Sequence, residues 1–203
     1  WSYLLYKLVK YFLFPENISL YDSVIIPLFI FQNAAILEVV HAFLRLVLSS
    51  PIVTIQQVSS RVMLVCGVLM LSPDARFSIG LPLALLAWSV TEIIRYAYYT
   101  LNLLNAVPHF LIWLRYTTFI ILYPIGVTGE LLCLYNAYNE LNRSNWGIVT
   151  FPNRLNFTFN YPYFLVGVML LYIPLFPQLY LHMFAQRKKT LGKETSSTNK
   201  KVT

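Results

Sequence analysis

Charged side chains are scarce in this sequence. Only 11% of its 203 residues are Asp, Glu, Lys or Arg, whereas 58% are hydrophobic. A soluble domain carries about a quarter charged residues, so this composition excludes an ordinary soluble protein. Several apolar runs are long enough to cross a bilayer as helices, and they lack the alternation of a β-barrel. Because lipid offers the backbone no hydrogen bonds, the sequence predicts an all-α, polytopic membrane helix bundle.

Residues that bind metals or form disulfides are also few. The chain has 2 cysteines and 3 histidines. Cys66 and Cys133 both lie in apolar segments, where a free cysteine acts as a small core residue, so we expect no disulfide. His41 has no second His or Cys at metal-ligand spacing. The sequence also has no glycine-rich phosphate loop, and we therefore expect neither a metal nor another cofactor.

Six apolar segments are predicted to form transmembrane helices. The first, at residues 1–14, is too short to span a bilayer, and we interpret it as a first helix truncated in this fragment. The other five are residues 23–48, 51–71, 78–104, 108–138 and 163–184. Pro174 and Pro177 should bend or break the last helix. Residues 1–186 are predicted to form a single bundle, and residues 187–203 a basic tail.

The positive charge, a net +7, is concentrated in the tail. Lys and Arg are enriched on the cytosolic side of membrane proteins, so we predict a cytosolic C-terminus that lies near the membrane and binds no nucleic acid. The tail contains Arg187, Lys188, Lys189, Lys193, Lys200 and Lys201. Its last two lysines match a dilysine retrieval signal of the endoplasmic reticulum. Glycosylation sequons begin at Asn17, Asn142 and Asn156, in loops on the predicted luminal side.

The most distinctive stretch is Leu122-Tyr-Pro-Ile-Gly-Val-Thr-Gly-Glu130 in the fifth segment. Tyr123 and Glu130 are seven residues apart, which places both on one helix face, about 10.5 Å apart along the axis. Gly126 lies between them and is predicted to leave a notch for a substrate. Pro124 cannot donate to the Ile120 carbonyl and should loosen the helix. An ionisable residue in a membrane helix indicates a functional site, the alternative being that Glu130 pairs structurally with an arginine.

Other charged residues lie within the predicted helices. Arg61 lies near mid-depth in the third segment and needs a carboxylate partner, for which Glu38 and Glu92 are candidates. Glu92 and Arg95 are predicted to pair within the fourth segment, which reduces the cost of burying both.

A helical stripe in the second segment is formed by Glu38, His41 and Arg45. Side chains at this spacing share one face. Because charged groups avoid lipid, we expect this stripe to face the interior of the bundle.

Several stretches together resemble the very-long-chain 3-hydroxyacyl-CoA dehydratases, also called protein-tyrosine-phosphatase-like proteins. The stretch from Leu122 to Glu130 closely resembles the signature of that family. The other matches are, in the same order, Glu38-Val-Val-His41, Gln57-Val-Ser-Ser-Arg61, Ala87-Trp-Ser-Val-Thr-Glu-Ile-Ile-Arg-Tyr96 and Tyr172-Ile-Pro-Leu-Phe-Pro-Gln-Leu-Tyr180. The resemblance implies six transmembrane helices in the endoplasmic reticulum, both termini in the cytosol, and a catalytic pair at Tyr123 and Glu130.

The sequence departs from the family pattern at the motif that gave the family its older, phosphatase-like name. That name came from a phosphatase-like cysteine motif near the end of the second segment. In this sequence, the residue after His41 is Ala42. A cysteine phosphatase needs a thiolate at that position, so we reject phosphatase activity.

The resemblance implies removal of water from a very-long-chain 3-hydroxyacyl-CoA to give the trans-2-enoyl-CoA, the third step of fatty-acid elongation. This elimination needs a base for the C2 proton and an acid for the 3-hydroxyl. We expect Glu130 to be the base and Tyr123 the acid, and the residues leave the reverse assignment open. The residues predicted to bind substrate or support this pair are Gly126, Arg61, Glu92, Arg95 and Arg115.

The two ends of the substrate are expected in different places. The acyl chain should lie in a tunnel between helices, and the anionic CoA head should lie near the cytosolic helix ends. Counting from Pro108 places Tyr123 about 22 Å and Glu130 about 33 Å along the segment, far from that head. The depth of the pair agrees with a cytosolic CoA head if a pantetheine arm reaches down the bundle, or if the fifth helix starts outside the membrane. The cations predicted to gather around the head are Arg45, Arg95, His109 and Arg187 to Lys189.

Two other functions fit parts of the sequence. A non-catalytic membrane scaffold that binds elongase or desaturase partners would show similar polar helix faces, but it would tolerate loss of Tyr123 and Glu130. A small transporter would line a path with buried Glu and Arg, but it should show broken helices in inverted halves, and no such symmetry is visible. For a dehydratase, the expected partners are the acyl-CoA substrate, membrane lipid and other elongation-cycle enzymes.

Overall fold

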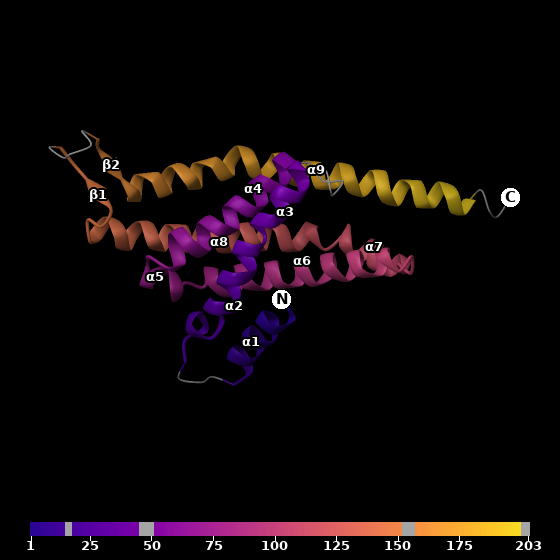
Figure 1. Cartoon of the computed structure of the whole chain (residues 1–203), viewed down its shortest axis with the longest axis horizontal. Helices are drawn as coiled ribbons and strands as arrows, with labels where there is room; N and C mark the ends of the chain where they lie inside the picture. The colour runs from indigo at the N-terminus through magenta and orange to yellow at the C-terminus, as the bar shows by residue number, and fades with distance from the viewer. Residues whose placement is uncertain (15–17, 45–50, 152–156, 200–203) are drawn as a thin grey trace.

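The computed structural model of the chain is built mainly of helices (Figure 1). It describes residues 1–14, 18–44, 51–151 and 157–199, with side chains described as far as residue 190. Its helices are α1 (Ser2–Leu13), α2 (Leu20–Ala34), α3 (Ile36–Phe43), α4 (Pro51–Val62), the π-helix η1 (Met63–Leu69), α5 (Pro73–Arg76), α6 (Gly80–Leu103), α7 (His109–Arg115), α8 (Phe119–Arg143) and α9 (Tyr161–Asn199). A two-stranded antiparallel hairpin of β1 (Ile148–Val149) and β2 (Phe159–Asn160) joins α8 to α9.

Three long helices, α6, α8 and α9, run along the same direction (Figure 1). Helix α8 contacts both of the others. Helix α4 continues into η1, which contacts α8, whereas α1 contacts α6 and α2. The C-terminal part of α9 extends beyond the other helices toward the end of the chain (Figure 1). Helix α8 is therefore the central element, and it carries both Tyr123 and Glu130.

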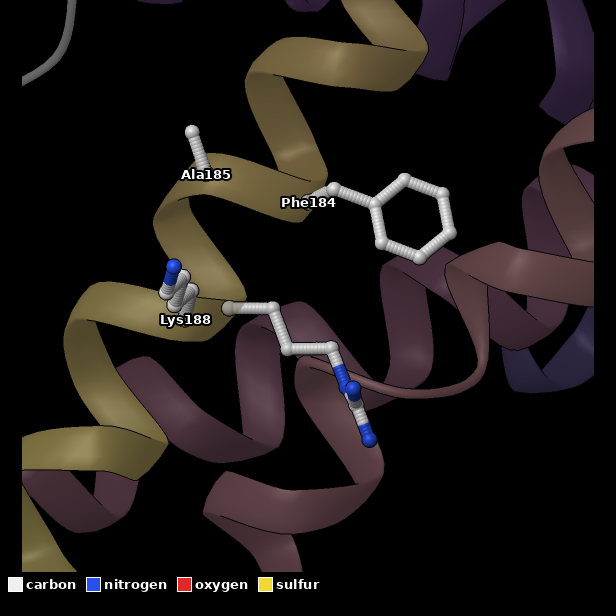
Figure 2. Close-up of a pocket in the computed structure, with 4 residues that line it drawn as sticks. Phe184, Ala185 and Lys188 are labelled. Carbon is white, nitrogen blue, oxygen red and sulfur yellow. The ribbon is translucent and has the colours of Figure 1, made fainter.

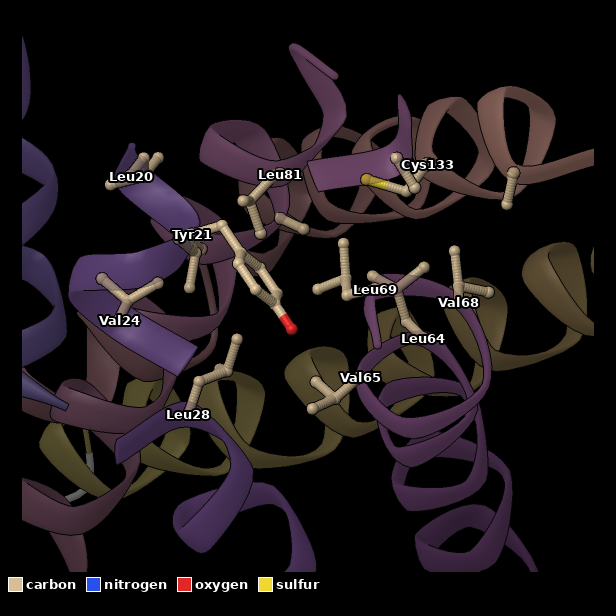
Figure 3. Close-up of a cluster of buried hydrophobic side chains, with 14 of the residues drawn as sticks. Leu20, Tyr21, Val24, Leu28, Leu64, Val65, Val68, Leu69, Leu81 and Cys133 are labelled. Carbon is tan, nitrogen blue, oxygen red and sulfur yellow. The ribbon is translucent and has the colours of Figure 1, made fainter. Parts of the chain in front are cut away.

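A cluster of buried apolar side chains holds α2, η1, α6 and α8 together (Figure 3). Val24 and Leu28 of α2 and Val65 of η1 are almost completely buried, as is Leu81 of α6. The Tyr21 ring lies among them, and the Arg76 guanidinium stands 4.6 Å from its centroid. This packing fixes η1 and the adjoining α4 against the central helix.

Small residues let α6 and α8 approach closely. A Cβ added to Gly129 would lie 2.6 Å from the Ala84 backbone nitrogen and 2.7 Å from the Gly80 carbonyl oxygen. A Cβ on Gly126 would lie 3.1 Å from the Ala87 Cβ. Small residues at such crossings are typical of membrane helices, which gain stability from close packing.

We expect Gly129→Ala to destabilise the protein, because its methyl group would overlap backbone atoms of α6. Overpacking of this kind costs about 1–3 kcal/mol, which lowers the unfolding midpoint by about 2–12 °C. The measurement is thermal unfolding of the detergent-purified protein. Gly167→Ala is the matched control, because no atom of the described residues lies within 4 Å of its added Cβ. Equal midpoints for the two variants would contradict the close helix crossing.

The prediction of six membrane spans is not confirmed. Among the described residues, 4 helical segments are long and apolar enough to cross a membrane: Leu20–Phe43, Pro51–Leu69, His109–Arg143 and Tyr161–Thr190. Helix α6 has 24 residues but is not one of these four. It contains Glu92 and Arg95, which lower its mean hydropathy. Helix α1 has only 12 residues.

Several predicted segments differ in their details. The fifth is interrupted at residues 116–118, between α7 and α8. The second is divided at Ala35, and its His41 is exposed, so the predicted interior stripe is wrong at that residue. Arg45 lies outside the described residues. Pro174 and Pro177 do not break α9, which also continues past residue 187 into the predicted tail.

Candidate active site

Glu130 is buried where α8 meets α4, α6 and α9. Its side chain is 5% exposed. Trp88 Nε1 of α6 donates a hydrogen bond to Glu130 Oε1 at 3.0 Å, and the Tyr172 hydroxyl of α9 donates to Oε2 at 2.6 Å. The Ser60 hydroxyl of α4 interacts with both Tyr172 and Glu130. Both carboxyl oxygens thus accept from a donor, a pattern suited to an ionised, acceptor-only carboxylate.

Tyr123 is half-buried and held by aromatic stacking. Its ring lies 5.1 Å from the Phe176 ring with an interplanar angle of 6°, and 5.9 Å from the Tyr180 ring with an angle of 10°. The charges of Glu130 and Arg61 act on its hydroxyl. Within the described part of the chain, that hydroxyl has no recorded hydrogen bond, so it is free to reach a substrate.

Pro124 helps to position this aromatic stack. A proline nitrogen cannot donate to the carbonyl four residues earlier, which here belongs to Ile120. The Tyr180 hydroxyl donates to that Ile120 oxygen instead, at 3.1 Å. The predicted loss of one backbone hydrogen bond is therefore confirmed, and α8 remains helical through Pro124. The freed carbonyl anchors Tyr180, which stacks on Tyr123.

Gly126 lies on the same helix face as Tyr123 and Glu130, but α6 packs against it. The space beside it is occupied by Ala87, as described above. The predicted substrate notch is therefore filled at this residue by a helix contact. The glycine instead permits the approach of α6, which brings Trp88 to Glu130.

An ion-pair network runs beside the site from α4 through α6 to α3. Arg61 Nη1 lies 2.5 Å from Glu92 Oε1, and Arg95 Nη2 lies 2.8 Å from Glu92 Oε2 and 2.5 Å from Glu38 Oε1. The Tyr96 hydroxyl donates to Glu38 at 2.8 Å. The predicted pairs of Glu92 with Arg61 and with Arg95 are thus confirmed. This matters because Glu92 is 1% exposed, and an unpaired buried carboxylate is costly.

The network is linked to the carboxyl site through Trp88. The Arg61 guanidinium carbon lies 5.9 Å from the Trp88 ring centroid. Trp88 in turn donates to Glu130. Arg61 and Glu92 therefore support the indole that holds the carboxylate.

Arg115 lies in an aromatic cluster instead of beside Glu130. Its guanidinium carbon is 4.1 Å from the centroid of Tyr98, 5.0 Å from that of Tyr99 and 5.6 Å from that of Tyr116. This cation–π cluster joins the start of the fifth segment to α6. Arg115 Nη1 is buried without a hydrogen-bond partner in the described structure.

The predicted cation cluster for the CoA head is only partly formed. Arg95 is held by two carboxylates, and Arg45 lies outside the described residues. Arg187 and Lys188, together with Phe184 and Ala185, line a cavity of about 420 Å³ on α9. Figure 2 shows the Phe184 ring pointing away from Ala185 and Lys188, and this ring packs 5.1 Å from that of Phe119.

A second cavity, of about 230 Å³, lies between α4 and α9. Neither cavity is lined by Tyr123 or Glu130. The predicted tunnel around the pair thus stays a prediction. Within the described ranges, His, Cys, Asp and Glu do not form a group that could hold a metal ion.

The break between α7 and α8 places the pair near the start of α8. Because α8 begins at Phe119, Tyr123 lies about 6 Å and Glu130 about 17 Å from the start of the helix. Residues His109–Arg143, which include both helices, still form one candidate membrane span, so the depths counted from Pro108 stay predictions.

The sequence reasoning missed Trp88 and Tyr172 as contacts of Glu130. Both lie in stretches that carry the family resemblance, but neither has a charge to single it out. A phenol within an otherwise apolar helix was the available signal for Tyr172, because a buried hydroxyl needs a partner.

Comparisons with known proteins bear on the identity of the chain. The family model described as "Protein tyrosine phosphatase-like protein, PTPLA" matches residues 32–193. The chain is 53% identical over 175 residues to the very-long-chain (3R)-3-hydroxyacyl-CoA dehydratase hpo-8 of Caenorhabditis elegans, covering 86% of this chain and 80% of that protein.

Two further relatives come from a mammal and a plant. Very-long-chain (3R)-3-hydroxyacyl-CoA dehydratase 2 of Mus musculus is 46% identical, over 86% of this chain and 68% of that protein. Very-long-chain (3R)-3-hydroxyacyl-CoA dehydratase PASTICCINO 2 of Arabidopsis thaliana is 35% identical, over 95% of this chain and 88% of that protein. No solved structure matches the chain.

Proposed function

The chain belongs to the protein tyrosine phosphatase-like (PTPLA) family, and on that premise we propose that it removes water from a very-long-chain 3-hydroxyacyl-CoA. The product is the trans-2-enoyl-CoA. The relatives are named as dehydratases of this substrate class, which makes the reaction that of a hydro-lyase. Ala42 stands where the phosphatase-like motif has its cysteine, so this position supplies no thiolate for the activity in the family name.

In this reaction, Tyr123 and Glu130 each take part in one proton transfer. The Glu130 carboxylate takes the C2 proton, which the thioester acidifies. The electrons of that C–H bond form the C2–C3 double bond as the C3–O bond breaks. The Tyr123 hydroxyl gives its proton to the departing hydroxyl, which leaves as water. The proton on Glu130 then returns to Tyr123 through solvent, and both groups are restored.

The observation that carries this proposal is the environment of Glu130. It is a buried carboxylate whose two oxygens are fixed by donors from two other helices. Each oxygen has a second lone pair, so the carboxylate can still accept a proton from a substrate. Tyr123 lies about two turns away on the same helix, and its hydroxyl has no hydrogen-bond partner among the described residues. A base and an acid are thus held on one rigid element.

Tyr172 is proposed as a positioning residue for Glu130. We expect Tyr172→Phe to lower kcat by about 10- to 100-fold, because a hydrogen bond to a charged group contributes about 1.5–3 kcal/mol. KM should stay within about twofold, since the acyl and CoA contacts remain. The measurement is steady-state kinetics of the purified variant beside Tyr163→Phe, which alters an exposed phenol on the same helix. A similar loss of kcat in both variants, or a change in Tyr172→Phe that is confined to KM, would count against this role.

The cellular setting follows from the tail and the substrate. We propose that the protein resides in the endoplasmic reticulum membrane with its basic C-terminus in the cytosol. There it would receive its substrate from the enzymes that precede it in fatty-acid elongation. The net positive charge of the tail supports a cytosolic position for it, and the relatives' names give a substrate class that the elongation enzymes supply.

The test of the proposed function is direct turnover. Purified protein in detergent is mixed with a very-long-chain 3-hydroxyacyl-CoA, and the enoyl product is followed by mass spectrometry. We expect conversion without an added metal or cofactor. The competing scaffold hypothesis predicts no conversion, together with normal elongation in cells that carry Tyr123 and Glu130 variants.

A further inference from the structure

The cavity between α4 and α9 contains two side-chain amides. Its volume is about 230 Å³, and its lining residues are Ile52, Val53, Gln56, Gln178, Leu179 and His182. Three of these are aliphatic, so the cavity offers apolar walls between two glutamines. Neither glutamine amide has a recorded hydrogen-bond partner among the described residues. Each glutamine therefore has a donor and an acceptor available for a ligand.

The inner end of this cavity leads toward the candidate active site. On α4, Ser60 lies one turn beyond Gln56 and on the same face. On α9, Tyr172 is seven residues before Leu179, again on the same face. Ser60 and Tyr172 both interact with Glu130. A ligand that extends inward along the two helices therefore arrives at the carboxylate.

The outer end leads toward the basic end of α9. His182 is about 15 Å along the helix from Tyr172, and Arg187 is about 22 Å from it. Arg187 and Lys188 line the larger cavity, of about 420 Å³. Moving outward from Glu130, the hydroxyls of Ser60 and Tyr172 come first. The α4–α9 cavity with its two glutamine amides follows, and the cations Arg187 and Lys188 come last.

We propose that the α4–α9 cavity binds the pantetheine arm of the CoA thioester. This inference rests on the proposed function. The arm carries two amides separated by short methylene chains, and each amide has one N–H and one C=O. Gln56 and Gln178 supply the complementary groups, while Ile52, Val53 and Leu179 contact the methylenes. The thioester then lies beside Glu130, and the nucleotide phosphates lie toward Arg187 and Lys188.

The test removes the two amides without removing their bulk. The variants are Gln56→Leu, Gln178→Leu and the double variant, assayed with the same 3-hydroxyacyl chain on three carriers. The carriers are CoA, pantetheine and N-acetylcysteamine, which have two amides with the nucleotide, two amides without it, and one amide. Each lost hydrogen bond should raise KM about three- to tenfold for the first two carriers, with kcat within about twofold. The change should be smaller for N-acetylcysteamine thioesters.

A steric variant and a matched control accompany these measurements. Val53→Phe fills the cavity and should raise the KM of the CoA thioester without altering either glutamine. Asn102→Leu removes an exposed amide of α6 outside the cavity and should leave the KM of all three thioesters unchanged. Gel filtration and thermal unfolding identify any variant that fails to fold, and the other variants then decide the outcome.

Two outcomes overturn the proposal. One is an unchanged KM of the CoA thioester in both the double variant and Val53→Phe. The other is an equal rise for all three carriers, which means that the acyl end is disturbed. Binding of an unreactive acyl-CoA thioether is measured in parallel, so the cavity is tested even if the wild-type protein shows no turnover. An unchanged Kd in the double variant then contradicts the pantetheine site, whereas absent turnover contradicts only the proposed function.

Discussion

Glu130→Gln is expected to lower kcat by about a thousandfold while the protein stays folded. General acid–base groups contribute about 10²- to 10⁴-fold, and an amide cannot accept the C2 proton. The fold should survive because glutamine has nearly the same shape. Its carbonyl oxygen can still accept from Trp88, and its NH₂ group can donate to the Tyr172 oxygen. The measurement is single-turnover conversion of the 3-hydroxyacyl-CoA together with thermal unfolding.

The matched control for this variant is Glu140→Gln on the same helix. Glu140 accepts from the Ser72 hydroxyl and from the Asp74 backbone N–H at 2.8 Å, so it caps α5 and lies away from Trp88 and Tyr172. A glutamine retains one acceptor oxygen there, and we expect near-normal turnover. The role of Glu130 as the base is refuted if both variants keep the parent rate.

Tyr123→Phe is the second variant with a large expected effect, a loss of about 10²- to 10⁴-fold in kcat. It removes only the hydroxyl oxygen, which has no recorded partner within the described structure. The ring keeps its stacking on Phe176 and Tyr180, so the local packing and KM should change little. The measurement is kcat and KM for the same substrate.

Tyr135→Phe provides the comparison for this result. Tyr135 is an exposed phenol on α8, five residues after Glu130 and therefore on a different face of the helix. Loss of activity in Tyr123→Phe alone supports its role as the acid. A normal kcat with a raised KM in that variant would assign Tyr123 to substrate binding instead.

The sequence predicted the local features of the site because they follow from helical periodicity. The spacing of Tyr123, Gly126 and Glu130 places them on one face, and Glu130 is buried. The missing Pro124 donor leaves the Ile120 carbonyl for another group, as the structure shows with Tyr180. These statements need only the geometry of one helix.

Features that depend on packing between helices were harder to predict. Nothing in the sequence places Trp88 and Tyr172 against the same carboxyl group, because they come from α6 and α9. The pairing of Arg61 with Glu92, instead of Glu38, also depends on how α4 crosses α6. The notch at Gly126 was misjudged because Ala87 of another helix fills it.

Errors in helix boundaries had local causes. Residues 116–118 contain no proline or glycine that would predict the break between α7 and α8. Pro174 and Pro177 leave α9 unbroken, since a helix can absorb a missing donor by small local changes. The predicted count of six spans is not confirmed, in part because Glu92 and Arg95 lower the hydropathy of α6 while pairing with each other.

The most direct test of the Glu130 mechanism follows the fate of the C2 hydrogen. A 3-hydroxyacyl-CoA carrying two deuterium atoms at C2 is given to wild-type protein and to Glu130→Gln in single turnover. We predict that the wild type forms an enoyl-CoA with one deuterium remaining, and that Glu130→Gln forms almost none in the same period. Formation of the singly labelled product by Glu130→Gln at the wild-type rate would contradict the account.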